Sequence, residues 1–119
     1  MILVDTSVWA DHIRHSDEDL VQLLITGRLL THPFIIEELA CGHLPDRDEF
    51  LAELHALPRA VIASHPEILA LISDKKLFGT GLGSVDIHII ASAMLSRAKV
   101  WSRDRAMMRE ASRLGVAVT

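Results

Sequence analysis

The chain alternates between short apolar runs and longer segments in which apolar residues recur every three or four positions. The short runs predict β-strands, because they are brief and rich in branched side chains. They cover residues 2–5, 29–31, 60–63, 99–102 and 116–118. The longer segments predict helices with one apolar face. Strands that alternate with helices indicate an α/β fold with three layers, α/β/α, around a central parallel sheet.

Polar residues stand where the predicted helices should begin. Thr6 or Ser7 suits the N-cap of the first helix, Ser16 that of the second and Asp104 that of the last. Hydroxyl and carboxylate oxygens at such positions accept hydrogen bonds from the free N–H groups of the first turn. We therefore expect these side chains to fix the helix starts.

Length and composition indicate one domain over residues 1–119. Half of the residues are hydrophobic, which is enough for a sizeable core. The single cysteine excludes an internal disulfide, as is usual in a reducing compartment. No apolar run is long enough for a membrane span and no basic region precedes the first one. We expect a cytoplasmic protein without a membrane partner.

The charges are unevenly distributed along the chain. The net charge of −4 is weak evidence against a nucleic-acid binder, which more often carries a basic surface. However, half of the twelve Lys and Arg residues fall between Arg97 and Arg113, and the first half of the chain is mostly acidic. This asymmetry has two interpretations: solvated helix faces, or a basic rim beside an acidic centre.

Carboxylates follow two of the predicted strands. Asp5 ends the first strand, and Asp104 lies just after "KVWSR". In parallel sheets, ligands bind beyond the carboxyl ends of the strands, so these two acids can meet at one edge. A charge beside buried apolar residues is costly unless it is paired. The sequence therefore predicts that a group of opposite charge or a set of hydrogen-bond donors at this edge offsets the negative charge of both acids.

Two further carboxylates stand in apolar surroundings without an interleaved Lys or Arg. One is Glu37 or Glu38 in "PFIIEELACG", which the helical phase alone does not separate. The other is Asp86, which shares the inward face of an apolar helix with Ile89 and Ile90. A charged residue on such a face needs a partner.

Several carboxylates in one place repel one another, so either some are protonated or a hard divalent cation neutralises them. Oxygen ligands suit Mg²⁺ or Mn²⁺ better than Zn²⁺. A water on such an ion can attack a phosphodiester. Hydroxyls of Thr6, Ser7 and Ser102 are placed to donate hydrogen bonds that orient the carboxylates.

Each acid also has a simpler interpretation. Asp5 and Asp104 are good helix caps, Glu38 suits an exposed helix face, and Asp86 suits the positive end of a helix dipole. Taken one by one, these alternatives remain open. They do not explain why four acids follow apolar segments at points that share one sheet edge.

Four segments resemble motifs of the PIN-domain family, and within it the small VapC-like ribonuclease toxins. "ILVDTSVW" is similar to the opening strand with its first acid, Asp5, and "HPFIIEELACG" to the second motif, which selects Glu38. "GLGSVDIHIIASA" is similar to the third motif and gives Asp86. "VWSRDRAM" resembles the fourth, Thr-x-Asp, with Ser102 in place of Thr and Asp104 as the acid.

The resemblance implies a PIN-like fold and a Mg²⁺- or Mn²⁺-dependent endoribonuclease that hydrolyses RNA, with tRNA or rRNA as expected substrates. It implies Asp5 and Asp86 as metal ligands, with Glu38 and Asp104 completing the acidic pocket. It also implies a homodimer and inhibition by a VapB-like antitoxin. Arg103 and Arg105 flank Asp104, where they suit phosphate contacts or simply a solvated helix end.

Two other functions remain as alternatives. A catalytically silent PIN-fold interaction module would keep the fold but need no acids. A haloacid-dehalogenase-like phosphatase also begins with a strand that ends in Asp. That chemistry uses a second Asp two positions later, where this chain has Ser7. His32 and His88 fall near the acids in the sequence, without a role that the residues alone assign.

Overall fold

A computed structural model describes residues 1–119 and contains a parallel sheet of three strands. The strands are β1 (Ile2–Val4), β2 (Leu29–Leu30) and β3 (Lys99–Trp101). They lie in the order β2-β1-β3, with Leu3 opposite both Leu30 and Val100. The predicted central parallel sheet is therefore confirmed. Because all three strands are parallel, their carboxyl ends meet at one edge.

Two of the predicted strands are wrong. Segment 60–63 forms no strand, and pairing there is limited to one bridge between Thr31 and Arg59. The N–H of Ala60 still donates to the carbonyl of Thr31 at 2.9 Å, but that of Val61 donates to Ser96 Oγ at 2.8 Å, so pairing with the β2 segment ends there. Segment 116–118 likewise contributes one bridge, between Val100 and Ala117.

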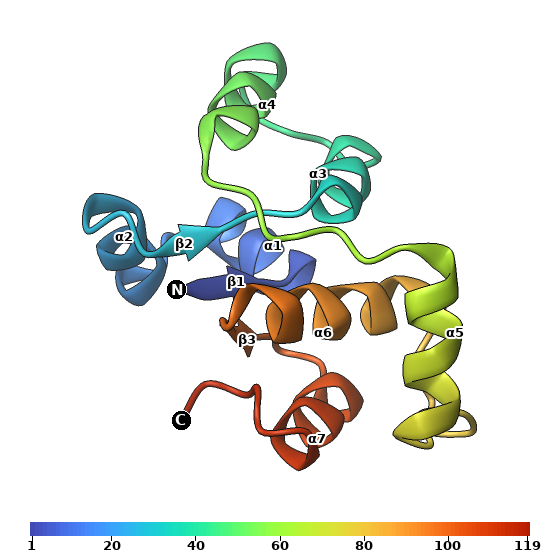
Figure 1. The fold of residues 1–119 in the computed structure, drawn as a ribbon. Coiled ribbons are helices and arrows are strands. Elements are labelled where there is room, and N and C mark those ends of the chain that lie inside the picture. The colour runs from blue at the N-terminus through green and yellow to red at the C-terminus, as the bar shows by residue number, and fades with distance from the viewer.

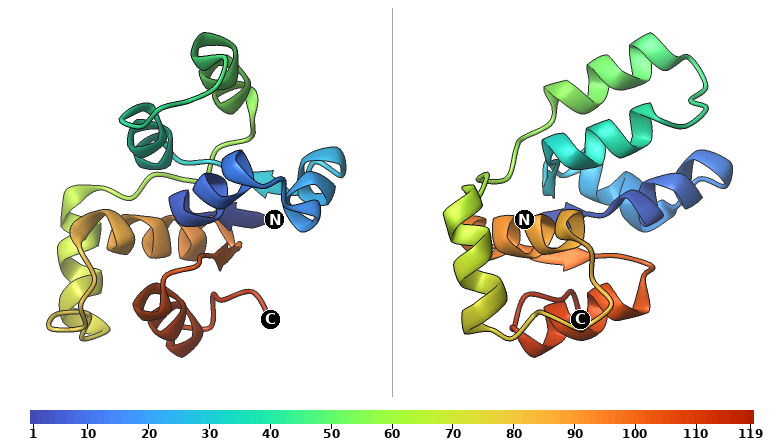
Figure 2. Two further views of the ribbon diagram at one scale, coloured as in Figure 1. Left: turned by 180° about the vertical axis from the view of Figure 1, so that it is seen from behind. Right: turned by 90° about the vertical axis from the view of Figure 1, so that its right-hand side faces the viewer.

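Seven helices surround the sheet: α1 (Thr6–Arg14), α2 (Glu18–Ile25), α3 (Pro33–Ala40), α4 (Arg47–Ala56), α5 (His65–Asp74), α6 (Ser84–Ser96) and α7 (Arg105–Arg113). Helix α1 lies on one face of the sheet and α6 on the opposite face (Figures 1 and 2). Helices α3 and α4 lie beyond the β2 edge, and α7 lies beyond the β3 edge (Figure 1). The α/β fold class is thus confirmed.

One part of the core lies between the sheet and α6, and the same cluster continues to α1 through Val8 and Trp9. Leu3, Val4 and Val100 of the strands are fully buried, as are Ile89 and Ile90 of α6. Burial of an aliphatic side chain of this size stabilises the fold by roughly 1.5–3 kcal/mol. This packing fixes α6 against the sheet. No helix has both the length and the apolar character that crossing a membrane requires.

The helix caps depart from the sequence expectations at two starts. Helix α1 has Asp5 at its N-cap but no side-chain capping hydrogen bond, so Thr6 and Ser7 do not cap it. Helix α2 is capped by Asp17, whose side chain accepts from the N–H of Leu20, and not by Ser16. The predicted cap of α7 is confirmed, as described below.

Candidate functional site

Four acids of the sequence analysis reach the same region from four different elements. Asp5 follows β1, Glu38 lies in α3, Asp86 in the first turn of α6, and Asp104 at the N-cap of α7. Burial raises the pKa of Asp86; the N–H of Gly83 opposes this, and the charges of Asp5, Asp104 and Glu38 raise it further. The structure therefore places the four carboxylates within electrostatic reach of one another.

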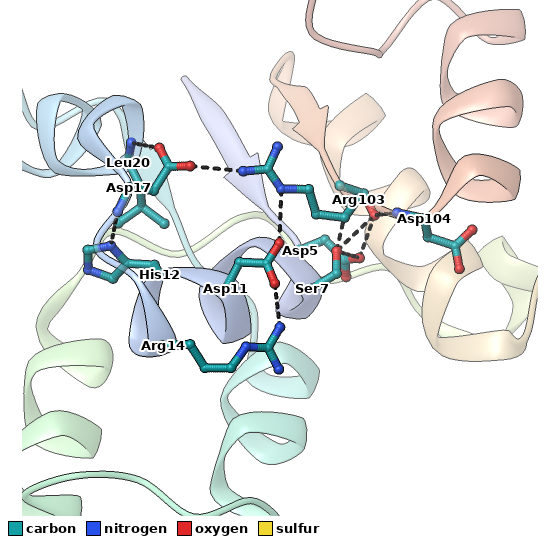
Figure 3. A network of polar contacts seen from close by, with 10 residues as sticks. Asp5, Ser7, Asp11, His12, Arg14, Asp17, Leu20, Arg103 and Asp104 are labelled. Atoms are coloured by element: carbon teal, nitrogen blue, oxygen red, sulfur yellow. Dashed lines mark hydrogen bonds and ion pairs between the residues drawn. The ribbon is translucent and has the colours of Figure 1, made fainter.

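Asp5 is the most buried of the four, with 7% of its surface exposed. Its Oδ2 accepts hydrogen bonds from Ser102 Oγ at 2.7 Å and from Ser7 Oγ at 3.1 Å (Figure 3). Its Oδ1 accepts none, and this oxygen is not among the fully buried polar atoms that lack a partner. One oxygen of Asp5 is thus anchored by two hydroxyls while the other stays free.

In Asp86 and Asp104, as in Asp5, one carboxylate oxygen accepts a hydrogen bond and the other does not. Asp86 Oδ2 accepts from the N–H of Gly83 at 3.2 Å, and Asp104 Oδ1 accepts from the N–H of Met107 at 3.0 Å. Both hydrogen bonds cap the start of a helix. The simpler interpretation, in which these acids stabilise helix N-termini, therefore holds for one oxygen of each carboxylate. The second oxygen of each has no hydrogen-bond donor within the chain. Sequence reasoning missed Gly83, although a residue three positions before an acid is the spacing of a capping box.

Helix α3 presents Glu38, whose Oε1 accepts from Thr6 Oγ1 at 2.7 Å. Glu37 is exposed and makes no such contact. The hydrogen bond from Thr6 crosses from α1 to α3, so it orients Glu38 toward the carboxyl end of β1. Glu38 is itself exposed, in keeping with its expected place on a helix surface, yet its charge acts on Asp86.

His32 begins α3 and is completely buried. Its Nδ1 accepts from the N–H of Phe34 at 3.0 Å, and the ring of Phe34 lies 5.2 Å from that of His32 and 4.8 Å from that of His88. Burial, with an added contribution from His88, lowers the pKa of His32 to about 4. The imidazole is therefore neutral at pH 7 and holds α3 in place.

Ser102 is the centre of the hydrogen-bond network at this edge. Besides donating to Asp5, its Oγ accepts from the N–H of Asp104 at 3.0 Å and lies 3.3 Å from Ser7 Oγ. Ser7 Oγ in turn accepts from the N–H of Arg103 at 2.9 Å. The hydroxyls expected to orient carboxylates thus link Asp5 to the start of α7.

On the expectation from the sequence that Asp5 ligates a metal for RNA cleavage, replacement of Ser102 by Ala should lower that cleavage about 10- to 100-fold, the usual effect of removing a group that orients a metal ligand. The change frees Asp5 Oδ2 from its shortest hydrogen bond and leaves the N–H of Asp104 without its acceptor. Ser102→Thr keeps the hydroxyl and should retain activity. The check is kcat/KM on one defined RNA, and equal rates for the Ala and Thr variants would rule out the orienting role.

Arg103 lies in the same loop but is already engaged in ion pairs. Its guanidinium lies 2.8 Å from Asp17 Oδ2 and 3.3 Å from Asp11 Oδ2 (Figure 3). It also lies 5.4 Å from the centre of the Trp101 ring. These contacts tie the loop after β3 to α1 and α2. Arg105 is exposed and its side chain makes no hydrogen bond or ion pair within the chain, so it is the freer of the two arginines.

The donor set suits a hard cation, since it consists of carboxylate oxygens. None of the five ion pairs of the chain involves the four acids, so no Lys or Arg compensates them. No three acidic, imidazole or thiol groups lie close enough to enclose a metal by themselves. Mg²⁺ needs no such cage, because it keeps several waters and uses one or two carboxylates.

Comparison with known proteins identifies relatives over nearly the whole chain. The PIN domain family matches residues 2–114. Ribonuclease VapC32 from two strains of Mycobacterium tuberculosis is 41% identical over 99% of this chain and 96% of its own. The crystal structure of PAE2754 from Pyrobaculum aerophilum superimposes with a TM-score of 0.61 at 16% identity, covering 92% of this chain and 78% of that one. The last similarity concerns the fold alone.

Proposed function

We propose, from the premise that this chain belongs to the PIN domain family and to its VapC branch, that it is a Mg²⁺- or Mn²⁺-dependent endoribonuclease. The relatives that are 41% identical carry the name ribonuclease, which supports this activity. We further propose that residues 1–119 form a single domain that acts in the cytoplasm as a toxin, on tRNA or rRNA. Its partners would be a second copy of the chain and a VapB-like antitoxin.

One observation carries the metal dependence: each of the four acids has one anchored and one free oxygen. The anchors are hydroxyls at Asp5 and Glu38 and backbone N–H groups at Asp86 and Asp104. Asp5 and Asp86 would ligate the ion, and Glu38 and Asp104 would complete the pocket. When bound, such an ion supplies an activated water and stabilises charge on the phosphoryl oxygens.

The residues of the chain contribute orientation and charge. Ser7 and Ser102 keep Asp5 fixed, and Thr6 keeps Glu38 fixed. Burial is the main cause of the raised pKa of Asp86, and the charges of the other three acids raise it further; a cation would relieve that repulsion. One of Glu38 and Asp104 would accept a hydrogen bond from the attacking water through its free oxygen.

The test is incubation of purified protein with total tRNA and total rRNA in Mg²⁺, Mn²⁺ or EDTA. The proposal predicts discrete RNA fragments with either ion and intact RNA in EDTA, with cleavage restored when excess Mn²⁺ is added back. Intact RNA under all conditions would favour the silent interaction module. Cleavage that persists undiminished in EDTA would exclude the metal mechanism.

A further inference from the structure

A row of arginines runs along α7, away from the acids. Arg105, Arg109 and Arg113 are four positions apart, a spacing that places them on one face of the helix. The helix begins directly after Asp104, so the row starts at the candidate active site. Arg105 is exposed, and the side chains of Arg109 and Arg113 are 60% and 45% exposed.

Hydrogen bonds hold the loop between α5 and α6 beside this row of arginines. Arg113 Nη2 donates to the carbonyl of Lys75 at 2.7 Å, and Arg109 Nη2 donates to that of Thr80 at 2.8 Å. Both arginines also donate through Nε to Glu110, Arg109 at 3.0 Å and Arg113 at 2.8 Å. Hydrogen bonds from Arg109 and then Arg113 lower the pKa of this buried Glu110, so it stays ionised. Each guanidinium has five N–H donors, so donors remain for a ligand.

The same loop leads to the acids at its other end. It finishes at Gly83, whose N–H holds Asp86, while α7 starts from Asp104. The loop and the arginine row are therefore two neighbouring borders of one acidic site.

The loop exposes an aromatic ring beside two lysines. Phe78 is 65% exposed, whereas its neighbour Leu77 is 1% exposed and anchors the loop in the core. Lys75 and Lys76 precede it and are exposed. An exposed ring on a loop that is anchored in this way offers a flat face on which a nucleotide base can stack.

Charge favours an anionic ligand here despite the net charge of the chain, which is −4. Five cations lie along α7 and the loop, against Glu110 in α7 and Asp74 at the end of α5. The four acids of the candidate site repel a phosphate backbone. A basic surface directly beside them offsets this repulsion and attracts the phosphate backbone of a nucleic acid to the acidic site.

We propose that these residues form a track for single-stranded RNA, an inference that rests on the proposed ribonuclease function. The α7 track consists of Arg105, Arg109, Arg113, Lys75, Lys76 and Phe78. The cations bind successive phosphates and Phe78 stacks on one unpaired base. An acidic protein would also meet the cations, but it would have no base to stack on Phe78.

The test measures RNA binding without cleavage, as fluorescence anisotropy of a labelled single strand with the Asp5→Asn protein in EDTA. In this background, Lys75→Ala/Lys76→Ala/Arg105→Ala removes three exposed cations whose side chains make no hydrogen bond or ion pair within the chain, so we expect the variant to fold. We expect affinity to fall at least ~10-fold, and the slope of log affinity against log salt to fall by about 2, at about 0.7 per lost phosphate contact. Phe78→Ala should weaken binding about 5-fold or more.

The matched control removes three exposed cations elsewhere, Arg28→Ala/Arg47→Ala/Arg59→Ala, in the segments around β2 and α4 that lie away from α7 (Figure 1). It should bind within about twofold of its parent. Equal losses in the two triple variants, unchanged binding by Phe78→Ala, or no binding by the parent would overturn the track. The track would also be overturned if an acidic peptide of equal charge displaced the labelled RNA as efficiently as unlabelled RNA does. Cleavage by the wild type is scored separately, so either proposal can fail alone.

Discussion

Replacement of Asp5 by Asn should lower RNA cleavage by about 10³-fold, equivalent to about 4 kcal/mol of barrier, while the fold survives. The amide oxygen of the new side chain still accepts from Ser7 and Ser102, so the local hydrogen bonds persist. What is lost is the negative charge and the free Oδ1. The measurement is the initial rate on one RNA in Mn²⁺, with circular dichroism to confirm folding.

Asp48→Asn is the matched control, because Asp48 is an exposed acid in α4 without a contact to the four acids. This variant should cleave at the rate of the wild type. Wild-type rates for Asp5→Asn would show that the carboxylate at the end of β1 takes no part in the chemistry, and the mechanism would have to be abandoned.

Replacement of Asp86 by Asn should abolish cleavage and yet stabilise the protein in EDTA. The amide side chain would keep an oxygen for the N–H of Gly83, so the cap of α6 is preserved. The substitution removes one of four mutually repelling charges. We expect the melting temperature in EDTA to rise by roughly 1–4 °C, since partly exposed charge interactions are worth at most about 1 kcal/mol.

The direction of this stability change follows from the protons that Asp86 binds in the folded and unfolded states. The pKa of Asp86 is raised in the folded state, so this group binds more protons folded than unfolded, and its ionisation destabilises the fold as pH rises past its unfolded pKa. The gain from Asp86→Asn should therefore be present at pH 7 and vanish in acid. Added Mn²⁺ should stabilise the wild type and not this variant. A lower melting temperature in EDTA would mean that the ionised Asp86 carboxylate does not destabilise the fold.

The sequence predicts the sheet well and its edges poorly. Buried strands such as Ile2–Val4 are recognisable from their apolar residues, and the parallel arrangement follows from the alternation with helices. Segment 60–63 is also apolar, but only its small end residues Ala60 and Ala63 are buried, whereas Val61 and Ile62 are each 53% exposed. Burial depends on tertiary contacts, such as that from Val61 to Ser96, which no local pattern encodes.

At the candidate site, the helix-capping preferences of the residues predict the wrong contacts, and the reason is physical. Thr6 and Ser7 are ordinary capping residues, but their hydroxyls point to Glu38 and Asp5 and leave α1 without a side-chain cap. Such conflicts between local preference and observed contacts are common at functional sites.

For Asp86 and Asp104, the roles of cap and site residue are not exclusive. Each carboxylate has two oxygens, and one of them caps a helix while the other remains free. The contacts of Arg103 with Asp11 and Asp17 could not be predicted from local sequence, because the paired residues are 92 and 86 positions apart in the chain.

Isothermal titration calorimetry with Mn²⁺ tests most directly whether the four acids form a cation site. The wild type should bind the ion at millimolar concentration or below, Asp5→Asn should show no binding, and Asp48→Asn should match the wild type. A wild type that takes up no Mn²⁺ at millimolar concentration, or an Asp5→Asn protein that binds it equally well, would contradict the shared site.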